Sequence, residues 1–280
     1  MKNLSEKSIL VSLIVSQWTA KKYDKKATSE VNSAHNAKDA GRFNKALIAK
    51  EHLGEIQKAV NAARTFHYEN TLPWNDSGER LLPAENYFTY CGELSKLKMQ
   101  FEHAVNSFTL EYPSLIDEAR QNLNGLFNPN EYPLDVREKF NFKTTFMPVP
   151  ETTDLRINLS DSEVFDLTAQ ISEEMNSRFA KAQLSIYERI ADQLKHMFER
   201  LSDKEASFKN SLFENVKDLV SLLPRLNVAN DKNITAMCND LNALYCDAEN
   251  VRNDKALRAQ KANEVETMLN KLNGFLTPAI

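Results

Sequence analysis

Apolar residues follow a helical spacing through the second half of the chain. From Val164 to Leu201 they recur every three or four positions for more than five heptads, which is typical of an amphipathic helix. About 40 residues at roughly 1.5 Å each give a helix of about 60 Å, longer than a compact domain needs. Such a helix must protrude or pair with long partners. Further apolar stripes begin at Leu212, Met237 and Leu257, so we expect an antiparallel helical hairpin or coiled-coil arm.

Three short segments alternate apolar and polar residues with a period of two, the spacing of a half-buried strand. They predict strands near residues 9–17, 140–147 and 154–159. The last two are close enough to form a hairpin, and an isolated hairpin is marginally stable in water. We therefore expect all three to form one small antiparallel sheet.

The rest of the first half consists of shorter helices separated by turns. Residues 23–40 are polar and predict a loop, and apolar spacing from Arg42 to about Tyr68 predicts a helix that includes Phe43. Pro83 suits the first turn of a following helix, with Phe88 on its buried side. The pair Tyr112–Pro113 is expected to break that helix. The fold class is thus mainly α with a small antiparallel sheet, divided into a mixed part at 1–160 and a helical arm at 161–280.

Glycine is scarce, and this excludes several classes of enzyme. The 280 residues contain six glycines, and no two of them are spaced as G-x-G. The chain therefore has no Walker A loop, no dinucleotide fingerprint and no G-x-S-x-G elbow. Apolar residues make up 42% and charged residues 26%, which is ordinary for a globular protein. The net charge of −4 argues against a protein whose whole surface binds nucleic acid.

The residues that hold metals or act as nucleophiles form no recognisable set. The three cysteines include no C-x-x-C, and the five histidines include no H-E-x-x-H. A helix-borne metal site is therefore unsupported, and reduced thiols fit an intracellular protein. We expect a non-enzymatic cytoplasmic protein with no cofactor, no metal and no membrane span.

A basic cluster lies directly after the first predicted strand. It contains four lysines, and Trp18 and Tyr23 flank or interrupt it. Aromatic rings among cations suit the stacking of single-stranded bases, although a solvated surface turn is the simpler interpretation. The candidate interaction residues here are Trp18, Lys21, Lys22, Lys25 and Lys26.

A second candidate is the segment Thr71–Pro83, in which two prolines bracket an Asp-Ser-Gly bend. The structural interpretation is that Trp74 fills a joint between helices and that Arg80 pairs with a carboxylate or caps a helix. The functional interpretation is a docking knob, because Trp and Arg are common interface anchors.

These motifs resemble an uncharacterised domain family found in bacteria, plasmids and phages. The resemblance covers about residues 9–160 and is carried by Trp18, Gly41–Phe43 with Lys45, Thr71–Trp74, Gly78 with Arg80–Pro83, Leu126–Phe127, Tyr132–Pro133, Phe140 with Phe142, Phe146 with Pro148–Pro150, and Asp154 with Arg156. Members are often encoded beside a MoxR-type AAA+ ATPase and a von Willebrand factor A-type protein. The resemblance therefore implies an accessory partner of such an ATPase, and it supplies no catalytic residues.

From these observations we expect an adaptor of phage or plasmid type that binds a protein partner, with a long arm that mediates either self-association into a homo-oligomer or partner binding. The alternative is a nucleic-acid-associated phage or plasmid protein that uses the basic cluster.

Overall fold

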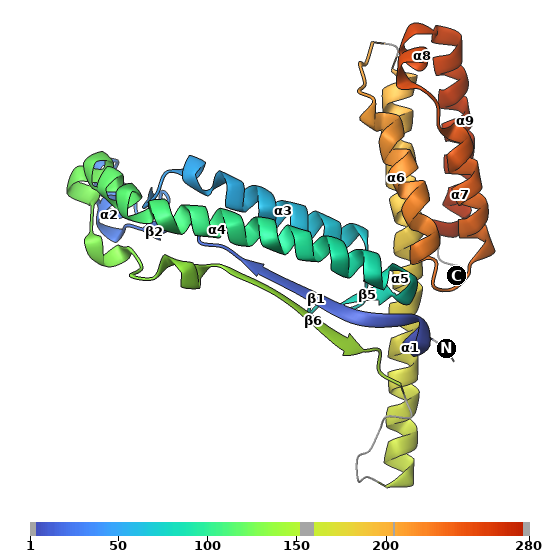
Figure 1. The fold of residues 1–280 in the computed structure, drawn as a ribbon, viewed down its shortest axis with the longest axis horizontal. Coiled ribbons are helices and arrows are strands. Elements are labelled where there is room, and N and C mark those ends of the chain that lie inside the picture. The colour runs from blue at the N-terminus through green and yellow to red at the C-terminus, as the bar shows by residue number, and fades with distance from the viewer. Residues whose placement is uncertain (1–3, 152–159, 204, 277–280) are drawn as a thin grey trace. The chain divides into compact units, whose positions relative to one another are not determined.

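The computed structural model describes residues 4–151, 160–203 and 205–276. Helices dominate these residues, and a small antiparallel sheet accompanies them (Figure 1), as the sequence predicts. The chain divides into two compact units. Unit 1 comprises Met1–Ser12, Tyr68–Tyr90 and Thr145–Ile280, and unit 2 comprises Leu13–His67 and Cys91–Thr144. The sequence instead predicts a mixed part at 1–160 and a helical arm at 161–280, and that division stays a prediction.

An antiparallel bundle forms most of unit 1. Its first helix, α5 (Asp161–Ser202), is 42 residues long. The next helices alternate in direction alongside its C-terminal half, and the short α8 closes the far end (Figure 1). Their bounds are α6 (Ser211–Leu226), α7 (Lys232–Leu244), α8 (Ala248–Asn253) and α9 (Lys255–Leu276).

Local sequence explains where these helices start. Ser160 and Glu163 form a capping box at the start of α5, so two backbone N–H groups of the first turn are satisfied. The side chains of Asp231 and Asp247 cap α7 and α8 by accepting hydrogen bonds from the N–H groups of Asn233 and Glu249. The predicted apolar stripes supply the core, including buried Ile190, Leu194, Leu223, Leu241 and Val265.

The sheet contributes a row of leucines to the same core. Its strand order is β4-β5-β1-β6, and Leu72, Leu81 and Leu10 lie opposite one another in the first three strands. All three side chains are buried with the bundle core. The strands are β1 (Ser8–Ser16), β4 (Leu72–Pro73), β5 (Arg80–Pro83) and β6 (Asn141–Pro148), and the four-residue helix α1 (Leu4–Lys7) precedes β1.

Aromatic residues fill the core of unit 2. Phe101 packs against Phe142 with 5.6 Å between ring centroids, and Phe108 lies 5.7 Å from Phe140. These rings belong to α4 and to β6 or the residue before it. The other elements of unit 2 are the two-stranded ribbon β2 (Lys21–Tyr23) with β3 (Asn44–Ala46), and α2 (Lys25–Ala34). Helix α3 (Gly54–Glu69) and α4 (Tyr87–Leu123) lie alongside each other (Figure 1).

Two of the three strand predictions fall on described residues, and both are confirmed. The segments near 9–17 and 140–147 correspond to β1 and β6. The segment 154–159 lies outside the described residues. Strand β5 was not predicted, because Pro83 was interpreted as the start of a helix rather than the end of a strand.

Two predictions for the first part of unit 2 are wrong. Helix α3 begins at Gly54 rather than near Arg42, because Asn44–Ala46 pairs with β2 instead. The predicted polar loop at 23–40 contains α2, whose start is capped by Asp24. Only Ala27 and Thr28 of this short helix are buried, so it has no long apolar stripe and was missed.

The predicted break at Pro113 is also wrong, because α4 continues through it to Leu123. Tyr112, Leu115 and Ala119 are buried in the core of unit 2 on both sides of the proline, while Pro113 itself faces solvent. Burial of the flanking residues outweighs the roughly 3 kcal/mol that an interior proline costs a helix.

Replacing this proline should therefore stabilise the protein. We expect Pro113→Ala to raise the free energy of unfolding by about 1–2 kcal/mol. Alanine restores a backbone N–H to the helix, and this gain exceeds the stability lost because the unfolded chain is less restricted without proline. Urea unfolding measures it. The control is Pro129→Ala, because Pro129 begins a short 3-10 helix where no N–H is required. Destabilisation by Pro113→Ala would contradict a continuous α4.

Candidate functional site

The Trp74 segment is a tight turn between β4 and β5. The Asn75 side-chain oxygen accepts hydrogen bonds from the N–H groups of Ser77 and Glu79, each at 3.1 Å. Gly78 has a φ of 92°, a conformation that favours glycine. Trp74 is only 4% exposed and lies in the core of unit 1. The indole therefore packs the turn, and the solvent-facing part of the segment is Asp76–Gly78.

Arg80 and Arg189 meet at the end of α3, where they act as helix caps. Arg189 Nη2 donates to the carbonyls of Tyr68 at 2.9 Å and Thr71 at 2.6 Å, and its Nη1 donates to that of Glu69 at 2.6 Å. Arg80 donates to Thr71 Oγ1 and O at 2.7 and 3.1 Å, and its guanidinium lies 4.7 Å above the Tyr68 ring. The last carbonyls of a helix lack intrahelical donors, and these arginines supply them.

Burial shifts the pKa values of the titratable groups at this cap. Burial and the nearby Arg80 lower the pKa of Arg189 to about 10, and burial lowers the pKa of Arg80 as well. Burial also raises the pKa of Glu69, although Arg189 opposes that change. Among the described residues, the salt bridges within 4.0 Å involve none of these three side chains. The pair thus binds backbone oxygens rather than carboxylates.

A groove of about 650 Å³ opens beside the arginine pair within unit 1. Leu219 and Leu222 of α6 supply its apolar part. Its charged lining mixes both signs and comprises Glu69, Arg80, Arg189, Asp192 and Asp218. Since the guanidiniums already bind carbonyls, the groove presents no concentrated charge for a ligand.

A second hollow, of about 420 Å³, is more apolar and also lies within unit 1. We call it the Phe88 hollow. Phe88 is 85% exposed, which is contrary to the prediction that it faces the core. Its ring packs edge-on against Tyr87, which in turn contacts Phe146. The full lining is Ser5, Glu6, Ser8, Ile9, Ala84, Tyr87, Phe88 and Pro148.

One polar group in this hollow lacks a partner. The hydroxyl of Ser8 is buried and forms no hydrogen bond with any described residue. Nothing in the sequence indicates this hollow, because helical spacing cannot tell a core phenylalanine from one at the edge of the buried stripe.

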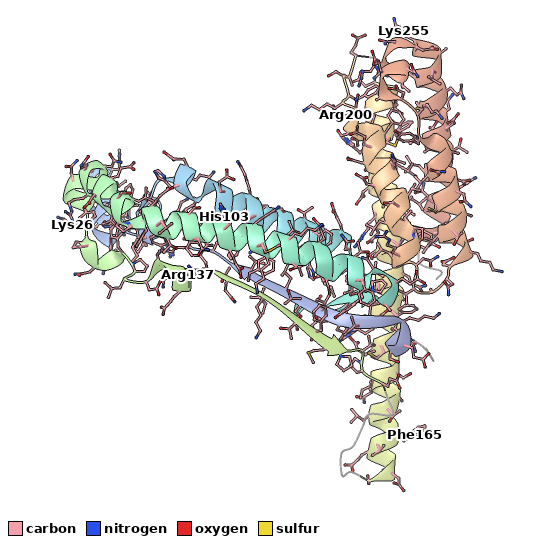
Figure 2. The ribbon with its side chains drawn as sticks, in the orientation of Figure 1. Lys26, His103, Arg137, Phe165, Arg200 and Lys255 are labelled. Carbon is pink, nitrogen blue, oxygen red and sulfur yellow. The ribbon has the colours of Figure 1, made fainter. Side chains whose placement is uncertain are left out.

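The predicted basic cluster lies at one end of unit 2. Lys21 and Lys22 are exposed on β2, and Lys25 and Lys26 are exposed in the first turn of α2. Figure 2 marks Lys26 at this end. The Trp18 ring does not join these lysines. It packs edge-on against the Tyr112 ring, with 5.9 Å between the ring centroids.

Sequence reasoning noted Tyr23 but missed further members of this surface. Phe43 is 39% exposed and Tyr23 is 46% exposed. The backbone N–H of Asp24 donates to the Phe43 carbonyl at 2.9 Å, so the two aromatic residues lie on neighbouring backbones. Lys38 and Arg42 are also exposed. The missed ribbon explains the omission, since a helix at 42–68 would have buried Phe43.

A buried ion pair holds this ribbon and α2 together. Lys45 is 5% exposed, and its Nζ lies 3.2 Å from Asp24 and 2.8 Å from Glu131. It also donates to the Leu126 carbonyl at 2.8 Å. Hydrogen bonds from Ala27 N–H and Lys45 lower the pKa of Asp24, while contacts with Glu131 and Asp24 raise the pKa of Lys45 despite its burial.

Comparisons with known proteins leave these observations to stand alone. No family model, no curated protein and no solved structure matches the chain. Within the described part of the chain, no group of three or more His, Cys, Asp or Glu residues could hold a metal ion. No described helix is long and apolar enough to cross a membrane.

The arginine cap should contribute strongly to stability. We expect Arg189→Gln to lower the free energy of unfolding by about 3 kcal/mol, because three carbonyls lose a charged donor. Urea unfolding followed by circular dichroism measures this. Arg178→Gln is the control, since Arg178 lies on the same helix and forms a surface salt bridge with Glu174. That pair should contribute less than about 1 kcal/mol. Equal effects would contradict the assigned role.

The Asp24–Lys45 pair should make stability depend on pH. Because the pKa of Asp24 is lower in the folded protein than its ordinary 3.8, the pair stabilises the fold above pH 3.8. This stabilisation is lost as the pH falls through the folded pKa. The variant Asp24→Asn keeps a helix-capping side chain but has no charge. Wild type should therefore be more stable than the variant near pH 6, and the difference should shrink as the pH falls below 3.8. A constant difference would rule out the ion pair as its cause.

Proposed function

We propose that this chain is a non-enzymatic adaptor that binds a partner protein through the Phe88 hollow. The observation that carries this proposal is the position of Phe88, whose ring is 85% exposed at a hollow lined by Ile9, Tyr87 and Pro148. An aromatic side chain that becomes buried on binding contributes roughly 1.5–3 kcal/mol. Aromatic anchors of this kind are frequent hot spots. A short apolar segment of a partner suits such a hollow.

The resemblance described above supplies the partner that we propose, a MoxR-type AAA+ ATPase acting with a von Willebrand factor A-type protein. Two of the motifs that carry the resemblance end at this hollow. The first ends at Pro83, directly before Ala84, and the second contains Pro148. Tyr87 follows the first motif and Phe146 belongs to the second, and the centroids of their rings are 5.7 Å apart. This convergence supports a shared binding role for the two motifs.

The test is a binding measurement with a purified MoxR-type AAA+ ATPase. Size-exclusion chromatography with light scattering gives the stoichiometry of the complex and reports whether the chain alone self-associates. Isothermal titration calorimetry gives the affinity. We expect a complex, and we expect Phe88→Ala to weaken it at least tenfold, because the exposed ring is the anchor.

Leu110→Ala is the matched control. Leu110 lies on the same helix and is 84% exposed, but it belongs to unit 2. Its variant should bind like wild type. No complex with the ATPase would overturn the proposed partner, and equal affinities of the Phe88→Ala variant and wild type would overturn the proposed surface.

A further inference from the structure

We propose that the exposed face of β2, the first turn of α2 and the residues before β3 bind single-stranded nucleic acid. We call this surface the basic end, and it consists of Lys21, Lys22, Tyr23, Lys25, Lys26, Lys38, Arg42 and Phe43. All of these residues are exposed and belong to unit 2. The proposal is independent of the adaptor function, which uses unit 1.

The local charge favours a polyanion. Residues 20–50 contain eight Lys and Arg but only three Asp and Glu. One of the acids, Asp24, pairs with the buried Lys45, which is one of the eight cations and is shared with Glu131. Glu30 faces Lys26 at 3.9 Å, and both side chains are largely exposed, so this pair is weak. The exposed lysines therefore keep most of their positive potential.

The start of α2 breaks a local rule in the same direction. The N-terminus of a helix carries partial positive charge, and acidic residues are preferred in its first turn. Here the first turn contains Lys25 and Lys26 and no acid, and the carboxylate at this helix end is that of the N-cap Asp24, which also pairs with Lys45. A phosphate group beside the two exposed lysines would therefore complement both their charge and the helix N-terminus.

Two aromatic rings point to bases as well as phosphates. Tyr23 and Phe43 lie on neighbouring backbones joined by the Asp24–Phe43 hydrogen bond, and both are partly exposed. Bases stack on such rings when their faces are not covered by a complementary strand. A duplex offers phosphates but no free base faces, and an acidic protein offers neither. Single-stranded DNA or RNA therefore matches all parts of the surface.

The basic end is also held in place. Lys45 binds Asp24, Glu131 and the Leu126 carbonyl, so it connects the ribbon and the cap of α2 to a distant part of unit 2. The cations and rings that surround this anchor are preorganised, which lowers the entropic cost of binding.

Fluorescence anisotropy with labelled 20-nucleotide DNA and RNA strands tests the proposal with the full chain. About four phosphate contacts should give a slope near −3 for log affinity against log salt, since single strands give about −0.7 per contact. We expect Lys→Gln at positions 21, 22, 25 and 26 together to weaken binding at least tenfold and to flatten this slope. Tyr23→Leu with Phe43→Leu should weaken binding about tenfold at an unchanged slope, and Tyr23→Phe should bind like wild type.

The matched control removes the same charge elsewhere in unit 2. Lys58, Lys96, Lys98 and Arg120 are exposed on α3 and α4, and changing all four to Gln should alter affinity less than twofold. Circular dichroism confirms that each variant is folded. Absence of binding at 50 mM salt, or equal losses in the control, would overturn the proposal. So would competition by polyglutamate as effective as by unlabelled strand, which would indicate an acidic protein ligand.

Discussion

The carbonyl groups at the end of α3 impose the constraint on which unit 1 depends. A backbone carbonyl that is withdrawn from water requires a donor, and those of Tyr68, Glu69 and Thr71 receive theirs from Arg189 on α5. Arg80 on β5 reinforces the same contact. The chain is thereby fixed where it enters β4. The β4–β5 turn follows, and its register with β1 places Pro83 opposite Ser8, at the Phe88 hollow.

Long basic side chains hold irregular segments together elsewhere in the molecule. In unit 2, Lys45 joins the ribbon to the segment around Leu126 and Glu131. In the bundle, Arg258 of α9 donates to four backbone carbonyls at the end of α5 and just after it. They belong to Arg200, Leu201, Asp203 and Ala206. A guanidinium has five donors in a planar fork, which suits several carbonyls at once. A chain with few glycines thus orders its turns largely through side-chain donors.

The sequence predicted those features that depend on local spacing. The 3–4 spacing after Val164 identifies α5, and alternation identifies β1 and β6. Contacts between distant residues were not predictable. Arg189 is an ordinary charged residue on an amphipathic helix, and nothing near it in sequence indicates the carbonyls 120 residues away. Likewise, only tertiary packing keeps α4 helical through Pro113.

The candidate surfaces show the same limit. The four lysines of the basic end are exposed, as a polar run suggests, but Trp18 packs inward and Phe43 faces outward. The exposure of Phe43 follows from the pairing of β2 with β3, and the packing of Trp18 follows from its contact with Tyr112 of α4; a single sequence reveals neither. Trp74 is buried for a comparable reason, because its turn closes onto the core of the bundle.

The net charge of the whole chain is a poor guide to what the basic end can bind. At 0.1 M salt, charges interact over about 10 Å, so acids farther away do not cancel the potential of Lys21 or Lys25. The relevant balance is local, where Lys45 pairs with both Asp24 and Glu131 inside the fold. Within residues 20–50 this leaves seven Lys and Arg against two acids, Glu30 and Asp39. The pairing thus removes one cation and one carboxylate from this segment's surface, and the excess of exposed cations remains.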